Sequence, residues 1–222
     1  LPDPRALAVY MRALDDPDPS LNRAGVHALS AIRDQAEAAI REARKGSTTP
    51  AAALALDRVL ARFEPVREWR VVGPLPNRAA GLIARDGSID PARTFPGAAG
   101  APVAWKLLHC KEDSGRLDLL PLMGESVQPN PSGRPAPRAA AAYAELTSAE
   151  ARRAFVLIRS TGATGLFVNG TPIDADSGSR GFLVVRLVAG LNRLLITTGP
   201  GATDWAFQCL VSTPDDRPSR PK

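Results

Sequence analysis

Cysteine is scarce in this chain, and its scarcity argues against several kinds of metal and haem site. The 222 residues contain two cysteines, Cys110 and Cys209, and neither belongs to a CxxC or CxxCH motif. A cysteine-based zinc site and covalently attached haem are therefore not supported. Two alternatives stay open for the pair, a disulfide in an oxidising compartment and two buried free thiols.

Histidine is equally scarce, which argues against nucleophilic catalysis because a serine or cysteine nucleophile usually needs a histidine base. His27 is expected within a helix, and His109 on a strand beside Cys110, where adjacent side chains point to opposite faces. The GxSxG, HExxH and P-loop motifs are missing. We therefore expect a protein that is not an enzyme, with no catalytic residues, no cofactor and no metal site. Hydrolysis by two carboxylates remains a minor alternative, since acidic residues are plentiful.

Long apolar runs are missing as well, and the positive charge is scattered. No run approaches the roughly 18 apolar residues of a membrane span, and the first residues lack the basic and apolar regions of a signal peptide. The chain begins at Leu1 rather than Met, so we expect that a leader or a preceding domain has been removed and that those upstream residues hold any targeting signal. The net charge of +5 forms no basic stripe with stacking aromatics. Neither nucleic acid nor a membrane span is expected.

The first 65 residues predict α-helical hairpins. Asp3 and Pro4 form a cap followed by proline at the first helical position, and the segment 15–20 (DDPDPS) ends the first helix. A second helix is expected from Pro19 or Ser20, a third over 34–45 and a fourth over 50–63. The buried stripe of the second helix is expected to contain Leu21, Ala24, Ala28, Leu29 and Ile32.

These helices repeat in pairs at a spacing of about 30 residues, which is typical of stacked helical hairpins. The turn D-D-P-D-P-S followed by L-N-R-A-G-V-H-A-L-S-A-I resembles a HEAT repeat. So short a segment buries little core alone. The resemblance therefore implies that the helices cap a longer array or dock on the domain that follows.

From Glu68 onward the apolar period becomes that of strands. Strands are predicted over 69–72, 103–110, 141–146, 153–160, 164–170, 182–188, 191–198 and 205–212. Asn169-Gly170 is the strongest hairpin signal, and the strands that flank Ala189-Gly190 are predicted to form a second hairpin. Alternation places Trp205, Phe207, Cys209 and Val211 on one core face.

The predicted fold class is α+β. Helical hairpins over 1–65 precede an antiparallel β-sandwich over 66–213, and 214–222 is expected to be a disordered tail. Trp69 and Trp205 are expected in the core, whereas core and surface placements are nearly equal for Trp105, which precedes Lys106.

Several motifs carry a second resemblance. They are W-x-V-x-G-P-x-P-N at 69–77, A-W-K at 104–106, G-R-L-D-L at 115–119, L-F-V-N-G-T-P-I at 166–173 and L-V-A-G-L-N-R-L-L-I at 187–196. Together they resemble the galactose-binding-like and protective-antigen-type jelly-roll sandwiches that are appended to large bacterial extracytoplasmic proteins. The resemblance implies a periplasmic or cell-envelope location and protein partners in a larger assembly.

One departure from that family concerns calcium. Its lectin-like members carry an acidic turn before the V-x-N-G strand, whereas 160–165 contains no carboxylate, so the inherited calcium site is not expected. Candidate ligand-binding residues are Trp105, Asn169, Asp174, Asp176 and Arg180. The expected function is a non-catalytic protein-interaction module of a larger assembly. The alternative is a carbohydrate-binding module.

Overall fold

The structure is a computed structural model that describes residues 2–47, 49–76, 81–98, 100–110, 113–122, 139–162, 164–173, 182–200 and 204–213. The chain divides into two compact units: a helical unit that runs to Arg62 and includes Thr213, and a unit of strands over Phe63–Ser212. The structure's own division thus lies between Arg62 and Phe63. The predicted tail at 214–222 falls outside the described residues.

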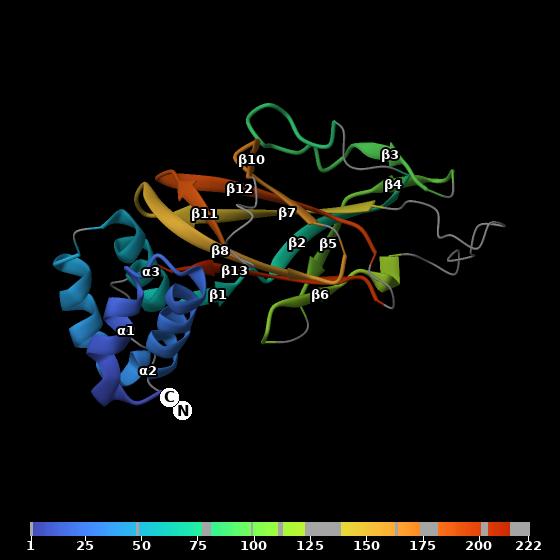
Figure 1. Cartoon of the computed structure of the whole chain (residues 1–222). Coiled ribbons are helices and arrows are strands. Elements are labelled where there is room, and N and C mark those ends of the chain that lie inside the picture. Colours follow the sequence, from blue (N-terminus) through green and yellow to red (C-terminus); the bar gives the residue numbers. More distant parts are fainter. Residues whose placement is uncertain are drawn as a thin grey trace. The chain divides into compact units, whose positions relative to one another are not determined.

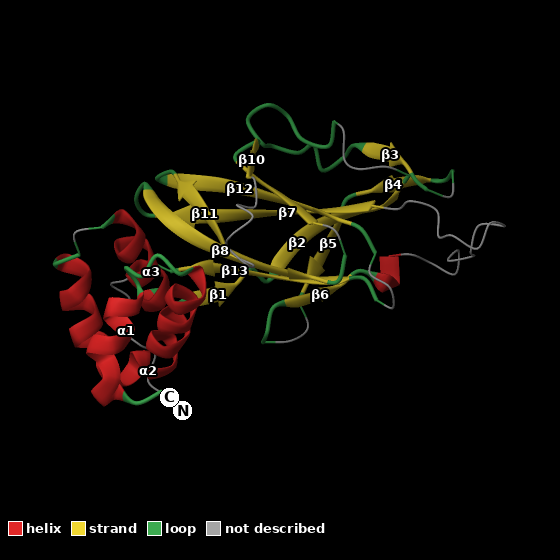
Figure 2. Ribbon diagram, in the orientation of Figure 1, coloured by secondary structure: helices red, strands yellow, loops and turns green. Residues whose placement is uncertain are grey.

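The helical unit contains a short 3-10 helix and three α-helices (Figure 2). They are η1 (Pro4–Ala6), α1 (Leu7–Ala13), α2 (Pro19–Lys45) and α3 (Pro50–Leu60). Capping side chains precede a proline at η1, α2 and α3: Asp3 accepts from the Arg5 amide at 2.9 Å, Asp18 from Ser20 at 2.8 Å and Thr49 from Ala52 at 3.2 Å. The starts predicted after Asp3 and at Pro19 or Ser20 are confirmed, because these caps satisfy amides that lack helical partners.

The predicted break between a second and a third helix is wrong. α2 continues through residues 33–35, where Arg-Asp-Gln contains no glycine or proline to end a helix. α3 ends at Leu60, earlier than predicted, because Ala61 takes an extended backbone with ψ of 132°. The unit is therefore one helical hairpin, α1 and α2, followed by α3, and not two successive hairpins.

The inner stripe of α2 is also rotated from its predicted position. Its buried residues are Gly25, Ala28, Leu29, Ile32, Ala36 and Ile40. Leu21 is 49% exposed and Ala24 is exposed, so their predicted burial is wrong. The stripe is centred near Ile32 and Ala36. Because an α-helix turns by about 100° per residue, Ala24 lies away from this stripe and faces solvent. Leu21 lies one turn before Gly25, where the backbones of α1 and α2 approach closely.

The second unit is an antiparallel β-sandwich, which confirms the predicted fold class (Figure 1). Its first sheet contains β1 (Phe63–Pro65), β13 (Ala206–Ser212), β8 (Arg152–Ser160) and β11 (Phe182–Leu187) in that order, with β6 (Arg116–Asp118) also paired to β13. Its second sheet contains β10 (Thr171–Ile173), β9 (Thr164–Val168), β12 (Gly190–Thr198), β7 (Ala139–Ser148), β2 (Glu68–Leu75) and β5 (Lys106–His109) in that order. A small pair, β3 (Thr94–Pro96) and β4 (Pro102–Ala104), and the 3-10 helix η2 (Leu120–Leu122) complete the described elements.

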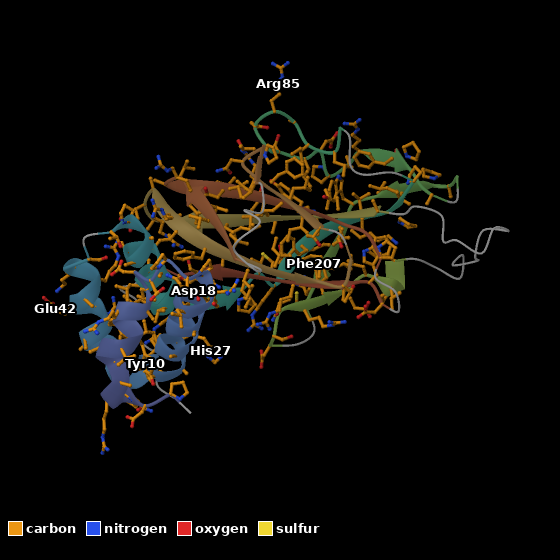
Figure 3. The ribbon with its side chains drawn as sticks, in the orientation of Figure 1. Tyr10, Asp18, His27, Glu42, Arg85 and Phe207 are labelled. Carbon is orange, nitrogen blue, oxygen red and sulfur yellow. The ribbon has the colours of Figure 1, made fainter. Side chains whose placement is uncertain are left out.

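The main core lies between these two sheets. Trp69 of the second sheet packs edge to face on Phe207 of the first, with ring centroids 5.1 Å apart, and Figure 3 shows Phe207 between the layers. The predicted core face of β13 is confirmed: Trp205, Phe207, Cys209 and Val211 are all buried in this cluster. Alternation along a strand therefore predicted the inward face correctly.

Of the two predicted hairpins, one is confirmed and one is wrong. β9 and β10 pair around Asn169-Gly170, whose φ angles of 49° and 80° are those of a type I′ turn. β11 and β12, in contrast, belong to different sheets, because β11 pairs with β8 and β12 with β7 and β9. Buried Asn192 holds the connection: its side chain accepts from the Val188 amide at 2.8 Å and donates to the Val188 carbonyl at 2.9 Å.

A second core covers the outer face of the second sheet. The segment 81–105, which includes β3 and β4, lies over this sheet (Figure 1). The cluster contains Val72, Leu75, Leu82, Phe95, Trp105, Ala139, Ala141, Tyr143 and Leu195. The sequence predicted no strand between 73 and 102, and it missed both the apolar cover and the short strands β1, β3 and β6, because three residues show no periodicity.

Candidate functional site

Trp105, a predicted ligand-binding residue, lies in the second core. It is 8% exposed, and its indole meets Phe95 and Tyr143 edge to face, with ring centroids 6.1 Å and 6.5 Å apart. A sugar stacks on an exposed indole face. In this structure the ring therefore contributes to packing and offers no open face to a ligand.

Asn169, the next predicted residue, uses its side chain inside the fold. Its Oδ1 accepts from the Arg193 amide at 2.8 Å, and its Nδ2 donates to Asn192 Oδ1 at 3.1 Å. These bonds tie the β9–β10 turn to β12. The three other predicted residues, Asp174, Asp176 and Arg180, fall outside the described residues.

A polar cluster that the sequence did not predict lies on the outer face of the second sheet. Tyr143 donates its hydroxyl to Glu145 Oε1 at 2.7 Å, and Arg193 lies opposite Glu145 in the β7–β12 register. Arg193 Nη1 is 3.5 Å from Asp86 Oδ2 and donates to the Asp86 carbonyl at 3.4 Å. We call Asp86, Tyr143, Glu145 and Arg193 the Arg193 cluster.

The electrostatics of this cluster suit binding more than proton transfer. Burial, with the hydrogen bond to Glu145, raises the pKa of Tyr143. Hydrogen bonds from Ser88, together with the charge of Arg193, lower the pKa of Asp86. At neutral pH the phenol therefore stays protonated and Asp86 stays ionised, so the cluster presents fixed charges and hydrogen-bonding groups.

A turn at 84–88 brings Asp86 to the sheet. A Cβ on Gly170 would lie 2.5 Å from the Arg85 carbonyl oxygen, and one on Gly87 would lie 2.5 Å from the Gly170 amide nitrogen. The two turns therefore pack backbone to backbone. Figure 3 shows the Arg85 side chain pointing away from the sheets. Sequence reasoning missed this cluster because Asp86 and Arg193 are 107 residues apart. The one available signal was that Tyr143 and Glu145 are two residues apart on a predicted strand, so their side chains share a face.

Both cysteines are free thiols in the structure. Burial raises the pKa of Cys209 to about 12 and also raises that of Cys110, whose Sγ lies 3.3 Å from the Gly115 carbonyl oxygen. Both thiols are therefore protonated, and hence weak nucleophiles, at neutral pH. The neighbouring His109 is exposed and lies 3.8 Å from Glu68 on the adjacent strand.

A third feature is an exposed surface around β11. Val184 and Val188 are 44% and 47% exposed. Arg153 of β8 and Arg186 of β11 are directly opposite in the strand register, and both are exposed. We call these four residues the β11 surface. It combines apolar side chains with paired positive charges.

Within the described ranges, no three histidine, cysteine, aspartate or glutamate side chains gather to hold a metal ion. Among the helices described, none is both long enough and apolar enough to cross a membrane.

Comparison with known proteins gives only remote structural likeness. No protein-family model matches the chain, and no curated protein sequence matches it. Solved structures that match include selenomethionine-labelled β-glucosidase from Kluyveromyces marxianus, with 14% identity and a TM-score of 0.39. The same enzyme in complex with glucose has 13% identity and a TM-score of 0.38. In both comparisons the match covers 67% of this chain and only 17% of the enzyme.

Proposed function

We propose that this chain is a non-catalytic protein-interaction module that serves a larger extracytoplasmic assembly. The observation that carries the proposal is the β11 surface, where two apolar side chains and two arginines are exposed on β11, the residue after it and the neighbouring β8. Clustered apolar and arginine side chains are typical of protein interfaces. A partner that covered them would remove apolar area from water and place counter-charges near the arginines.

The finer family assignment is part of this proposal. The confirmed Asn169-Gly170 hairpin and the two-sheet core support a galactose-binding-like, protective-antigen-type sandwich. A HEAT-like origin of the helices rests on one hairpin, α1 and α2, joined through D-D-P-D-P-S. The extracytoplasmic location rests on the motif resemblance alone.

The test uses the whole chain as bait in a native cell extract. Each captured protein is produced separately, and its affinity for the chain is measured by titration calorimetry. Val184→Asp with Val188→Asp should weaken a true complex by tenfold or more, because a charge in an apolar contact costs about 2 kcal/mol or more on desolvation.

Leu107→Asp is the matched control. Leu107 is 47% exposed on β5, in the other sheet, so it matches Val188 in exposure and lies away from the β11 surface. It should leave the affinity unchanged. A chain that stays monomeric and binds no captured protein in a saturable manner contradicts the proposal.

Carbohydrate binding is the second candidate, and the Arg193 cluster favours it. An exposed carboxylate, Glu145, lies opposite a half-buried guanidinium, Arg193, on one face, and buried Tyr143 holds the carboxylate by a hydrogen bond. Carboxylate and guanidinium groups exchange hydrogen bonds readily with sugar hydroxyls. A glycan array probed with and without calcium tests it. Glu145→Gln and Arg193→Met should each reduce any specific signal, and an array without signal removes this candidate.

A further inference from the structure

The first observation is that β11 lies at the edge of its sheet. In the order β1-β13-β8-β11 it is the last strand, and within the described residues it pairs with β8 alone. Its backbone groups on the side away from β8 therefore have no strand partner in the described part of the chain. The sequence Phe-Leu-Val-Val-Arg-Leu contains no proline, the residue that commonly protects an edge strand from pairing.

The second observation is the pair of like charges on this edge. Arg186 and Arg153 are cross-strand neighbours on the exposed face, a position where two positive charges destabilise the free sheet. The ion pairs found among the described residues include neither of them. A carboxylate that approaches both would relieve this repulsion.

The third observation is the apolar side chain beside that pair. Val184 precedes Arg186 by two residues, so both point to the same face, and Val184 is 44% exposed. An extended segment that adds to β11 would place alternate side chains beside these two residues. The side chain of the segment beside Val184 should be apolar, and the side chain beside Arg186 should be acidic.

From these observations we propose that β11 receives an extended acidic segment of another protein by strand addition. Its carboxylates lie opposite Arg186, with Arg153 one strand further, and its apolar side chains lie opposite Val184. The inference rests on the proposed interaction function and names its partner. A second copy of this chain is a poorer occupant, because pairing of the two β11 edges would bring Arg186 of one copy toward Arg186 of the other, and the two positive charges repel. Nucleic acid is also a poorer occupant, because phosphates offer nothing apolar to Val184.

The experiment titrates the full chain against a labelled eight-residue peptide of alternating glutamate and valine, followed by fluorescence anisotropy. A peptide with the same composition in two blocks and one of alternating lysine and valine are the comparison probes. The alternating acidic peptide should bind at least tenfold more tightly than either. Hydrogen exchange should slow at β11 when it binds.

Charge-reversed variants test the surface itself. Arg186→Glu should weaken binding of the acidic peptide by tenfold or more. It should also raise the melting temperature of the free chain, because it replaces a repulsive charge pair with Arg153 by an attractive one. Arg159→Glu is the control, since Arg159 is exposed on the same face of β8, about 20 Å along the strand from Arg153. It should change the affinity by less than twofold. Arg186→Gln replaces Arg186→Glu if the latter fails to fold.

Several outcomes overturn the inference. The inference fails if the block peptide or the lysine peptide binds as tightly as the alternating acidic peptide. It also fails if Arg186→Glu leaves the affinity for the acidic peptide unchanged. Concentration-dependent dimerisation through β11 would show that a second copy of the chain is the occupant. A labelled oligonucleotide that binds more tightly than the acidic peptide, and no longer binds the Arg186→Glu variant, would show that nucleic acid is the occupant. If a protein captured by the chain binds Arg186→Glu normally, the interaction function stands and this surface assignment fails.

Discussion

At the scale of single residues, buried polar contacts hold the turns of the sandwich in place. Asn192 is fully buried and satisfies the backbone of Val188 at both its amide and its carbonyl. Asn169 ties its own turn to the Arg193 amide. Such side chains are costly to remove because the part-buried backbone groups that they pair with would lose these hydrogen bonds.

Gly170 offers a test of the contact between the two turns. Gly170→Ala should lower the free energy of unfolding by roughly 3 kcal/mol or more, because the new Cβ adds a backbone clash to the strain of a positive φ. That Cβ would lie 2.5 Å from the Arg85 carbonyl oxygen, at φ of 80°. Urea unfolding followed by tryptophan fluorescence measures the change.

Gly190→Ala is the matched control. Gly190 also has a positive φ, of 90°, but a Cβ there meets no atom within 4 Å. It should cost only about 1 kcal/mol, which is the strain of a left-handed conformation. Equal losses in the two variants would show that the 84–88 turn moves away without cost.

At the scale of elements, α2 organises the helical unit. Its apolar stripe packs against both α1 and α3, and Glu37 on the same helix binds two arginines: Arg41 Nη2 and Arg62 Nη2 each lie 2.9 Å from a Glu37 oxygen. Arg62 follows α3, so this ion pair joins the middle of α2 to the end of the unit. Packing and charge thus act on the same helix.

The rotated stripe of α2 makes a prediction about leucines. Leu29→Ala should lower the free energy of unfolding by about 2–5 kcal/mol, because it leaves a cavity at a fully buried site. Leu21→Ala, on the same helix and 49% exposed, should change it by less than about 0.5 kcal/mol. Thermal unfolding followed by circular dichroism measures both. A large loss at Leu21 would show that this residue is buried in solution.

Glu37 makes a prediction about pH. Its hydrogen bonds from Arg41 and Arg62 outweigh burial and lower its pKa below the ordinary 4.5. A lowered pKa in the folded state adds stability above the ordinary pKa, and this stability is lost as the pH falls through the folded-state pKa. Glu37→Gln should therefore be less stable than the native chain at neutral pH, and the difference should disappear in acid.

Urea unfolding across a pH series measures this difference. The control is Glu42→Gln on the same helix, since the Glu42 side chain is 77% exposed and its ion pair is with Lys45, whose side chain is 75% exposed. Its difference from the native chain should be small at every pH. If the effect of Glu37→Gln did not vary with pH, the ion pair would not be its cause.

At the scale of the whole molecule, the strand unit has two cores that share one sheet. β7 and β12 lie in the middle of the second sheet, with the main core on one face and the second core on the other. Side chains on both of their faces are buried along the runs Ala139–Ala144 of β7 and Leu194–Thr198 of β12. This sheet is therefore the best-protected part of the strand unit.

Hydrogen exchange tests this arrangement. Amides in the middle of β7 and β12 should exchange at least roughly tenfold more slowly than those of β10, which lies at the edge of the same sheet. The central strands open only with both cores, whereas an edge strand opens locally. Uniform exchange across the sheet would show that it opens as a single unit.

The sequence by itself determined the class and the order of elements, because these depend on local chemistry. Caps before prolines marked the helix starts, the alternation of β13 marked its inward face, and Asn169-Gly170 marked a turn that needs positive φ angles. The predicted break inside α2 failed because residues 33–35 contain no glycine or proline to end a helix.

Only the tertiary structure decided which strands pair and which polar groups meet. The strands around Ala189-Gly190 look like a hairpin locally, yet they join two sheets, because burial of both inner faces outweighs pairing of sequence neighbours. The Arg193 cluster and the opposed Arg153 and Arg186 likewise arise from register between segments that are distant in the chain. Distant contacts carry no periodic signal, so no local pattern could have placed them.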